Sequence, residues 1–338
     1  MRAAVLKQPG TLVVEEVEDP SCGDDEVIVK VAQCGICGTD RSIFRGEYSV
    51  GTPAILGHEY SGTVVEVGSK VNGVSPSDRV VVDPNVVDDV CFYCRSGSSN
   101  LCTGLSPLGV ARPGGFAEYS VVPARYLYEV PDGVSLAEAS LVEPLACCVR
   151  GIDQAGIDVG DVVVVSGAGP IGCLLIQLAR LAGAATILAV EPSQARREHG
   201  LLAGSDIVCA PDEAVAELTR VRGTIGADVV IEASGSPASA EVIFRQVRRG
   251  GTVLLFGVYP VNEHIAVSPF RVNEDELRVV GSLNNPNTHQ RAIDLIATRR
   301  VQVDSVVTHR LGLDLLAKAM DLTNFPTAGK IAIDLQSD

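Results

Sequence analysis

Residues 162–172 read Val-Val-Val-Val-Ser-Gly-Ala-Gly-Pro-Ile-Gly, and this stretch is the strongest indication of the fold class. The apolar run predicts a buried strand, and the glycines that follow have the spacing G-x-G-x-x-G. In that pattern Gly167 permits a tight turn, Gly169 lets the backbone approach a pyrophosphate, and Gly172 lets helix and strand pack closely. Pro170 suits the first turn of a helix, where the N–H that it lacks has no partner. The stretch therefore predicts a strand, a phosphate-binding turn and a helix.

An acidic residue follows at the position that a dinucleotide site needs. Glu191 stands at the end of the next predicted strand, Thr186–Val190. Such an acid binds both hydroxyls of an adenosine ribose and repels a 2′-phosphate, which favours NAD over NADP. Arg196 and Arg197 lie nearby and weaken that preference. A simple turn and a solvated carboxylate would explain the features singly, but their combination predicts an NAD site.

Strands and helices alternate around this unit, which implies right-handed crossovers and a parallel sheet. The further predicted strands are Ile207–Cys209, Asp228–Glu232 and Thr252–Phe256. The predicted helices are Pro170–Ala182, Ala195–Ala203, Asp212–Val221 and Ala238–Val247. Before residue 150 the pattern changes to short β-type runs at Leu12–Val17, Val27–Ala32, Ser61–Val67 and Arg79–Val82, followed by a helical stretch, Pro131–Gly156, that starts with a capping box at Ser135-Leu-Ala-Glu138. After Gly281 we expect helices at Asn287–Thr298 and Leu313–Leu322 and a strand at Lys330–Leu335.

Composition limits the class of protein. The chain has 338 residues, of which 46% are apolar, and a formal net charge of −15. A surface of that charge disfavours nucleic acid and anionic membranes as partners. The apolar run of Val162–Ile176 contains glycines and a proline, and the start of the chain is too short in apolar residues for a signal peptide. We therefore expect a cytoplasmic protein, whose ten cysteines bind metal or are buried rather than forming disulfides.

Cysteine, histidine and carboxylate residues gather in the β-rich half. Cys34-Gly-Ile-Cys37-Gly-Thr-Asp40 and Gly57-His-Glu-Tyr60 offer the ligand types that four-coordinate zinc takes. A redox pair is the alternative for Cys34 and Cys37, but no thioredoxin-like unit surrounds them. A lone histidine is more often a hydrogen-bonded core residue than a ligand. The residues taken singly leave both interpretations open.

Taken together, the residues resemble a known family. Cys37-Gly-Thr-Asp40, Gly57-His58-Glu59, the cysteines at 91–102 and Glu143-Pro144 are similar to zinc-dependent medium-chain alcohol dehydrogenases, in the branch of polyol, sugar and threonine dehydrogenases. The resemblance continues in order through the glycine loop, Asp228–Glu232 and Gly281, so it covers nearly the whole chain. It implies an α/β protein with a GroES-like β-barrel catalytic domain, residues 1–150 and 284–338, and a Rossmann domain with a doubly wound parallel sheet, residues 151–283.

The resemblance also implies site residues. Cys37, His58 and Glu143 would bind a catalytic Zn²⁺, with Glu59 ligating directly or exchanging with water. Thr39 looks like the hydroxyl that accepts the substrate proton, and Asp40 would hydrogen-bond His58. The predicted cofactor-binding residues are Gly167, Gly169, Pro170, Ile171, Gly172, Glu191, Arg196, Gly257, Val258, Ser282 and Leu283. The implied reaction transfers a hydride from a secondary alcohol to NAD in a homo-oligomer, a dimer or tetramer.

A second cysteine cluster resembles the structural zinc lobe of the family. It contains Cys91, Cys94 and Cys102, and Asp88 stands where relatives usually have a fourth cysteine. Either Asp88 completes a Cys₃Asp zinc site or the lobe holds no metal. Cys22, Cys173 and Cys209 are expected to be small buried residues, and Cys147 and Cys148 to contribute to packing.

One departure concerns the proton exit, because this chain has Ser42 where many relatives have a histidine. The resemblance favours a polyol, sugar or cyclitol substrate. Five polar residues either face such a substrate or are loop residues in water, namely Ser42, Arg45, Glu47, Asn284 and Asn285. L-threonine is the nearest rival substrate. Two rival functions differ in kind: a zinc-free quinone or enone reductase, which would lack the ligand set, and a non-catalytic NAD-binding protein.

Overall fold

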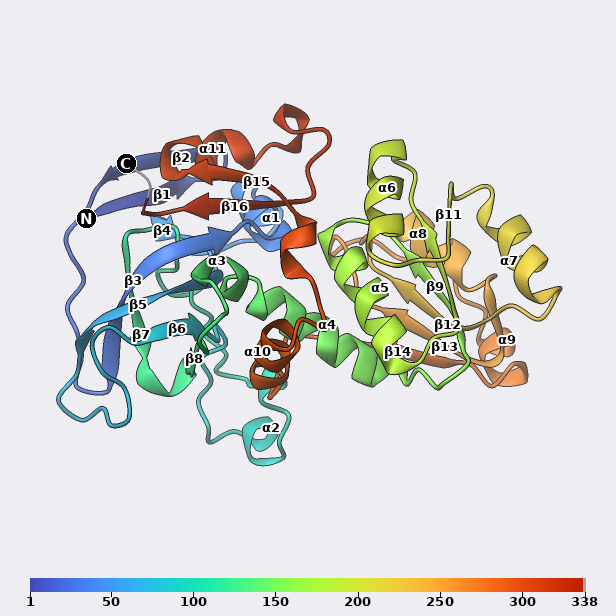
Figure 1. Ribbon diagram of the computed structural model, residues 1–338, viewed down its shortest axis with the longest axis horizontal. Coiled ribbons are helices and arrows are strands. Elements are labelled where there is room, and N and C mark those ends of the chain that lie inside the picture. Colours follow the sequence, from blue (N-terminus) through green and yellow to red (C-terminus); the bar gives the residue numbers. More distant parts are fainter. Residues whose placement is uncertain (337–338) are drawn as a thin grey trace. The chain divides into compact units, whose positions relative to one another are not determined.

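The computed structural model describes residues 1–336 and divides into two compact units. The first unit comprises residues 1–146, 286–299 and the chain from 307 on, and the second comprises residues 147–285 and 300–306. Within the described residues, no helix is long and apolar enough to cross a membrane. Figure 1 shows the mostly β first unit and the layered α/β second unit.

The second unit is built on a six-stranded parallel sheet in the order β11-β10-β9-β12-β13-β14. Its strands are β9 (Val162–Ser166), β10 (Thr186–Val190), β11 (Ile207–Cys209), β12 (Ala227–Glu232), β13 (Val247–Leu255) and β14 (Arg278–Gly281). The central strands β9 and β12 are buried along their whole length, which explains their nearly continuous apolar sequences. This strand order is that of the Rossmann fold, and it places the change of winding direction beside β9.

Helices connect these strands and cover both faces of the sheet. They are α5 (Pro170–Ala182), α6 (Gln194–Leu202), α7 (Ala214–Arg222), α8 (Pro237–Ile243) and α9 (Pro269–Glu274), with a 3₁₀ turn at Val303–Val306. Helix α4 (Val142–Ala155) begins in the first unit and ends in the second. Helix α5 ends at Gly183, whose φ of 117° is in the region that glycine tolerates.

The first unit contains a seven-stranded sheet and a three-stranded sheet. The larger runs in the order β15-β16-β3-β5-β6-β8, with β7 paired to β3; the smaller has the order β2-β1-β4. The strands are β1 (Arg2–Gln8), β2 (Thr11–Glu16), β3 (Glu26–Gly35), β4 (Ala54–Ile55), β5 (Glu59–Val67), β6 (Arg79–Val82), β7 (Tyr119–Pro123), β8 (Leu127–Glu129), β15 (Val307–Gly312) and β16 (Lys330–Asp334). Tyr60 and Phe116 are among the largest buried side chains of its core.

Short helices lie between these strands. The α-helices are α1 (Gly38–Phe44), α2 (Phe92–Arg95), α3 (Leu136–Ala139), α10 (His289–Ala297) and α11 (Leu316–Ala319). Short 3₁₀ turns occupy Ser99–Leu101, Ala124–Tyr126, Leu313–Leu315 and Leu322–Asn324. The ends of β3, β5 and β16 are neighbours in the sheet, and α1 follows β3 after two residues. Segments far apart in the sequence therefore meet at this edge.

The fold class predicted from the sequence is confirmed, and the differences are local. Four predicted elements have the observed bounds, namely Arg79–Val82, Pro170–Ala182, Thr186–Val190 and Ile207–Cys209. The predicted helix Pro131–Gly156 is two helices, α3 and α4, because the capping box at Ser135 starts a short helix that ends before α4 begins. The predicted helix Ala238–Val247 ends at Ile243, since β13 already begins at Val247.

Candidate active site, metal lobe and nucleotide loop

Three of the predicted zinc ligands meet in the first unit. The side-chain ligand atoms of Cys37, His58 and Glu59 all lie within 4.8 Å of one another. Cys37 directly precedes α1, His58 directly precedes β5, and Glu59 is the first residue of β5. Gly57 makes the approach possible because its φ is 93° and a Cβ there would lie 2.8 Å from the Cys34 sulfur.

Asp40 connects the two segments that carry these ligands. One carboxylate oxygen accepts the Cys37 N–H at 2.8 Å, and the other accepts the Gly57 N–H at 3.3 Å. The second oxygen also lies 3.5 Å from Nδ1 of His58. Burial lowers the pKa of His58, but the negative charges of Asp40 and Cys37 outweigh burial and raise it well above its usual range. The pocket therefore attracts positive charge.

A buried lysine from the end of the chain completes this region, and no local sequence pattern indicated it. Nζ of Lys330, the first residue of β16, donates to both carboxylate oxygens of Glu59, at 2.7 and 2.6 Å, and to the Ile36 carbonyl at 3.3 Å. Gly35 leaves the room that Glu59 needs, since a Cβ there would lie 2.2 Å from a Glu59 oxygen. The site thus holds an ion pair whose two partners are both buried.

Glu143 stands apart from the three-residue cluster but acts on the same lysine. It is buried in the first turn of α4 and is not one of the described residues whose ligand atoms fall within 4.8 Å. Burial lowers the pKa of Lys330, while Glu59, Cys37 and Glu143 raise it, and the net shift is upward. Cys37, Glu59 and Glu143 thus all raise the pKa of this one lysine.

The donor set of this pocket fits a zinc ion. It offers a thiol, an imidazole and carboxylates, which are the common zinc ligands. Nδ1 of His58 faces the Asp40 carboxylate at 3.5 Å, so the other ring nitrogen, Nε2, would be the one to bind a metal. A thiol, an imidazole and a carboxylate whose ligand atoms lie within 4.8 Å of one another form a pocket suited to a cation.

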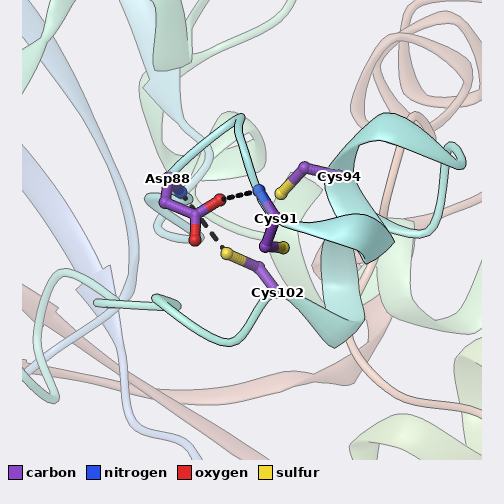
Figure 2. Close-up of side chains that lie close together, drawn as sticks. All are labelled: Asp88, Cys91, Cys94 and Cys102. Carbon is purple, nitrogen blue, oxygen red and sulfur yellow. Dashed lines mark hydrogen bonds between the residues drawn. The ribbon is translucent and has the colours of Figure 1, made fainter.

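The second cluster is the cysteine lobe, residues 88–104. The ligand atoms of Asp88, Cys91, Cys94 and Cys102 all lie within 4.8 Å of one another, and Figure 2 shows the four side chains around one centre. Asp88 accepts the N–H groups of Val90 and Cys91, each at 3.0 Å. The Cys102 sulfur accepts the N–H of Asp88 at 3.4 Å and that of Gly104 at 3.3 Å. Backbone N–H groups of the loop thus hold two of the four side chains, Asp88 and Cys102, in place.

The acidity of these groups also points to a cation. The N–H groups of Cys94 and Thr103 lower the pKa of the Cys91 thiol to about 7. Burial and the neighbouring Cys102 and Cys91 raise the pKa of the Cys94 thiol to about 12. Three thiols and a carboxylate this close together repel one another when they are ionised. A divalent cation would remove that conflict, so Cys₃Asp fits a structural zinc.

The glycine loop of the second unit has the geometry predicted from its spacing. Gly167 has φ of 104°, and a Cβ on Gly172 would lie 1.8 Å from the Gly167 carbonyl oxygen. Gly169 precedes α5, and a Cβ there would meet no atom of the described residues within 4 Å, so the space above the helix N-terminus is open. Pro170 and Ile171, which open α5, are half-buried. The open N-terminus suits a pyrophosphate.

Glu191 has more contacts than its predicted role required. One of its oxygens accepts the N–H of Ala168, inside the glycine loop, at 3.0 Å. The other accepts the N–H of Ser193 at 2.9 Å and two guanidinium donors of Arg196 at 3.0 and 3.1 Å. Arg197 donates to the Gln194 side chain at 2.6 Å and to the Glu191 backbone carbonyl at 3.5 Å. Glu191 therefore fixes the loop as well as standing where a ribose would bind.

The remaining predicted site residues lie on loops and helix ends. Thr39 is half-buried in α1, and Ser42 accepts a hydrogen bond from Arg45 at 3.4 Å. Arg45 also pairs with Glu47 at 2.6 Å. Gly257 and Val258 follow β13, and Ser282 and Leu283 follow β14, so both pairs lie at the carboxyl ends of neighbouring strands.

Comparison with known proteins identifies the family. Residues 23–132 match the alcohol dehydrogenase GroES-like domain, and residues 170–298 match the zinc-binding dehydrogenase domain. D-arabinitol dehydrogenase 1 of Uromyces fabae is 32% identical over 98% of this chain and 97% of its own. The chain belongs to the zinc-containing medium-chain alcohol dehydrogenases.

Solved structures of this alcohol dehydrogenase family agree. A Sinorhizobium meliloti 1021 protein described as a zinc-binding dehydrogenase, solved with NADP, has a TM-score of 0.93 and 36% identity, covering 99% of each chain. An Escherichia coli CFT073 alcohol dehydrogenase, solved with NADH, has a TM-score of 0.92 and 28% identity, also covering 99% of each chain. Relatives include sorbitol and L-threonine dehydrogenases. The protein is a zinc-dependent NAD(P) dehydrogenase of the polyol and threonine type, and its family acts on small-molecule alcohols.

Proposed function

We propose that this dehydrogenase oxidises a secondary alcohol of a polyol, sugar or cyclitol and transfers the hydride to NAD. The observation that carries the proposal is the cluster of Cys37, His58 and Glu59. Glu143 belongs to the same region, because its charge, like that of Glu59, raises the pKa of the buried Lys330. The polar residues Arg45 and Glu47 follow α1, the helix that bears Thr39. Both of them are exposed and could reach the hydroxyls of a polyhydroxylated substrate.

Each side chain of the site would have a distinct role. Cys37, His58 and Glu143 would hold the zinc, with Glu59 as a ligand that can exchange. When bound, zinc polarises the substrate hydroxyl and lowers its pKa. Thr39, half-buried in the first turn of α1 two residues after Cys37, would accept the proton from that hydroxyl. Asp40 would keep the imidazole of His58 oriented through its 3.5 Å approach to Nδ1.

A substrate panel tests this proposal. NADH formation would be followed with polyols, aldoses, aminocyclitols, L-threonine, ethanol and propan-2-ol. A site that hydrogen-bonds several hydroxyls leaves polar groups unpaired when a simple alcohol binds, so kcat/KM for the best polyhydroxylated substrate should exceed that for ethanol by about a hundredfold or more. Equal or better turnover of the short alcohols would contradict the proposal. L-threonine is the second candidate, since an L-threonine 3-dehydrogenase of Pyrococcus abyssi is 34% identical.

We also propose that NAD is preferred over NADP through Glu191. The carboxylate is buried and held by Ala168, Ser193 and Arg196, so a 2′-phosphate would meet a fixed negative charge. We expect kcat/KM for NAD to exceed that for NADP by at least about tenfold, equal to roughly 1.4 kcal/mol. Glu191→Ala should narrow the difference. A wild-type preference for NADP would show that Arg196 and Arg197 dominate instead.

We further propose a homo-oligomeric, cytoplasmic enzyme in which residues 1–150 and 284–338 form the catalytic domain and residues 151–283 bind NAD. Strand β14 lies at one edge of the parallel sheet, and Val279 on it is 42% exposed. An open edge strand with an apolar side chain is a surface that a second copy can cover through strand pairing. The mass in solution, measured by light scattering, tests the oligomer.

A further inference from the structure

A buried carboxylate at the end of β12 takes part in neither the metal pocket nor the glycine loop. Glu232, the last residue of β12, is fully buried, and its two oxygens receive four hydrogen bonds. Ser234 donates its N–H at 3.0 Å and also its hydroxyl, and Gly235 donates its N–H at 3.0 Å. The fourth donor is the hydroxyl of Tyr259 at 2.6 Å. Three of these donors lie in the turn after β12, and the fourth comes from the loop after β13.

That loop has few other attachments among the described residues. Phe256 and Gly257 still donate to the Glu232 carbonyl, each at 2.9 Å, but among residues 258–264 only Tyr259 is not exposed. Val258 and Val261 on either side of it are each 84% exposed. Tyr259 is therefore the side chain that holds the loop against the body of the unit.

Three loops are packed together at this end of the sheet. A Cβ on Gly167 would lie 3.2 Å from the Ser234 nitrogen, and one on Gly235 would lie 2.5 Å from the Val258 carbonyl oxygen. The phosphate-binding loop thus touches the turn after β12, which in turn touches the loop after β13. A displacement of the last loop at Val258 would therefore also displace the turn after β12, because the contact between them is through backbone atoms.

The strand order indicates which part of the cofactor lies here. Glu191 ends β10, on one side of β9, and so marks the adenosine end of the dinucleotide. The pyrophosphate belongs at the N-terminus of α5, directly after β9. A dinucleotide laid across the carboxyl ends of the strands then continues over β12 and β13, on the other side of β9. Its nicotinamide half would then lie over the carboxyl end of β13, where the loop that Tyr259 holds begins.

We propose that Tyr259 is a positioning residue for the nicotinamide half of NAD, acting through its hydrogen bond to Glu232. The bond fixes the loop of residues 257–264, which binds the nicotinamide half of the cofactor, while binding of the adenosine half depends on Glu191 and the glycine loop. Burial and the bond to Glu232 raise the pKa of the Tyr259 hydroxyl, so it remains a proton donor across the working pH range. The inference depends on NAD binding and not on the proposed substrate.

The test compares two ligands on the zinc-loaded full chain without any alcohol substrate. Tyr259→Phe removes only the hydroxyl, and binding of NADH and of ADP-ribose, which lacks nicotinamide, is measured by calorimetry. A hydrogen bond to a charged group is among the stronger ones, but only part of its free energy would be transmitted to cofactor binding. We therefore expect NADH to bind about five- to tenfold more weakly. ADP-ribose should bind as in the wild type.

A matched control separates positioning from general loss of stability. The Ser205 hydroxyl donates to the Gly200 carbonyl at 2.7 Å before β11, at the amino end of the same sheet, and is also buried. Ser205→Ala should lower the melting temperature without changing the affinity for NADH. Unchanged NADH binding in Tyr259→Phe, or equal weakening of NADH and ADP-ribose, would overturn the proposal.

Hydrogen exchange on the wild type gives an independent measurement that needs no variant. NADH should slow exchange of the amides in residues 257–264 more than ADP-ribose does, because only NADH reaches the loop. Equal protection by the two ligands would also overturn the proposal. Neither result depends on which alcohol the enzyme oxidises.

Discussion

The pocket of Cys37, His58 and Glu59 and the cysteine lobe both bring ligand atoms within 4.8 Å of one another, but their ligands come from different distances along the chain. The pocket joins the residue before α1 to the start of β5 and a lysine from β16. The lobe takes all its ligands from residues 88–102. The surroundings of the pocket are therefore set by segments far apart in the sequence, whereas the lobe forms within a single loop.

The charges around the two sites differ in the same way. Around the pocket, Asp40 holds Cys37 and Gly57, and Lys330 neutralises Glu59 within the buried interior. Around the lobe, the nearby ion pair of Arg125 and Asp89 is about half exposed. Buried charges need partners because water does not screen them, while exposed ones gain little from pairing. The comparison predicts large effects at the pocket and smaller ones at the lobe.

The largest effect should come from Cys37→Ser or His58→Ala. A Lewis acid supplies several kcal/mol of stabilisation to the transition state, so loss of the zinc should reduce kcat/KM by about a thousandfold or more. NAD binding should be retained, because the glycine loop belongs to the other unit. Turnover and metal content of the purified variants check this. Near-native activity without zinc at the site would refute the assignment of these ligands.

A smaller but still large effect is expected for Lys330→Met, which leaves Glu59 buried without its partner. Removing one member of a buried ion pair costs about 3–5 kcal/mol, which urea unfolding would measure. Lys330→Met combined with Glu59→Gln should recover part of the loss, since no charge then stays unpaired. Arg125→Met, which breaks the exposed pair with Asp89, is the matched control and should cost about 1 kcal/mol or less. Similar losses of unfolding free energy in Lys330→Met and Arg125→Met would contradict the difference drawn between the buried and the exposed ion pair.

The smallest effect concerns Asp88 and stability alone. Asp88→Ala removes one of four ligands, so zinc should fall from about two to about one per chain and the melting temperature by about 5 °C, because metal bound only to the folded state stabilises that state. The kcat should stay close to that of the wild type. Asp88→Cys should keep the second zinc. One zinc in the wild type, with an unchanged melting temperature in Asp88→Ala, would show that the lobe holds no metal.

Local patterns predicted much of this protein. The glycine spacing after Val162–Val165 predicted the loop geometry that Gly167 and Gly172 show, because the contacts that require those glycines lie within a few residues of each other. The cysteine lobe was predictable for the same reason: its four ligands lie in one short loop. The alternation of strands and helices predicted the parallel sheet. Short-range interactions depend on neighbouring residues, so sequence reasoning can find them.

Contacts between distant segments were decided only by the tertiary structure. No local pattern indicates that Lys330 pairs with Glu59, or that Tyr259 donates to Glu232, since each pair forms when two strands or loops become neighbours in a sheet. The end of the helix after Pro237 was also missed, because pairing of β13 with β12 makes Val247 part of a strand. A buried charge needs a partner of opposite charge, and that partner can come from any segment that the fold brings close. The residue types of the site were thus determined by local sequence, while the partners of its buried charges were determined by packing across the fold.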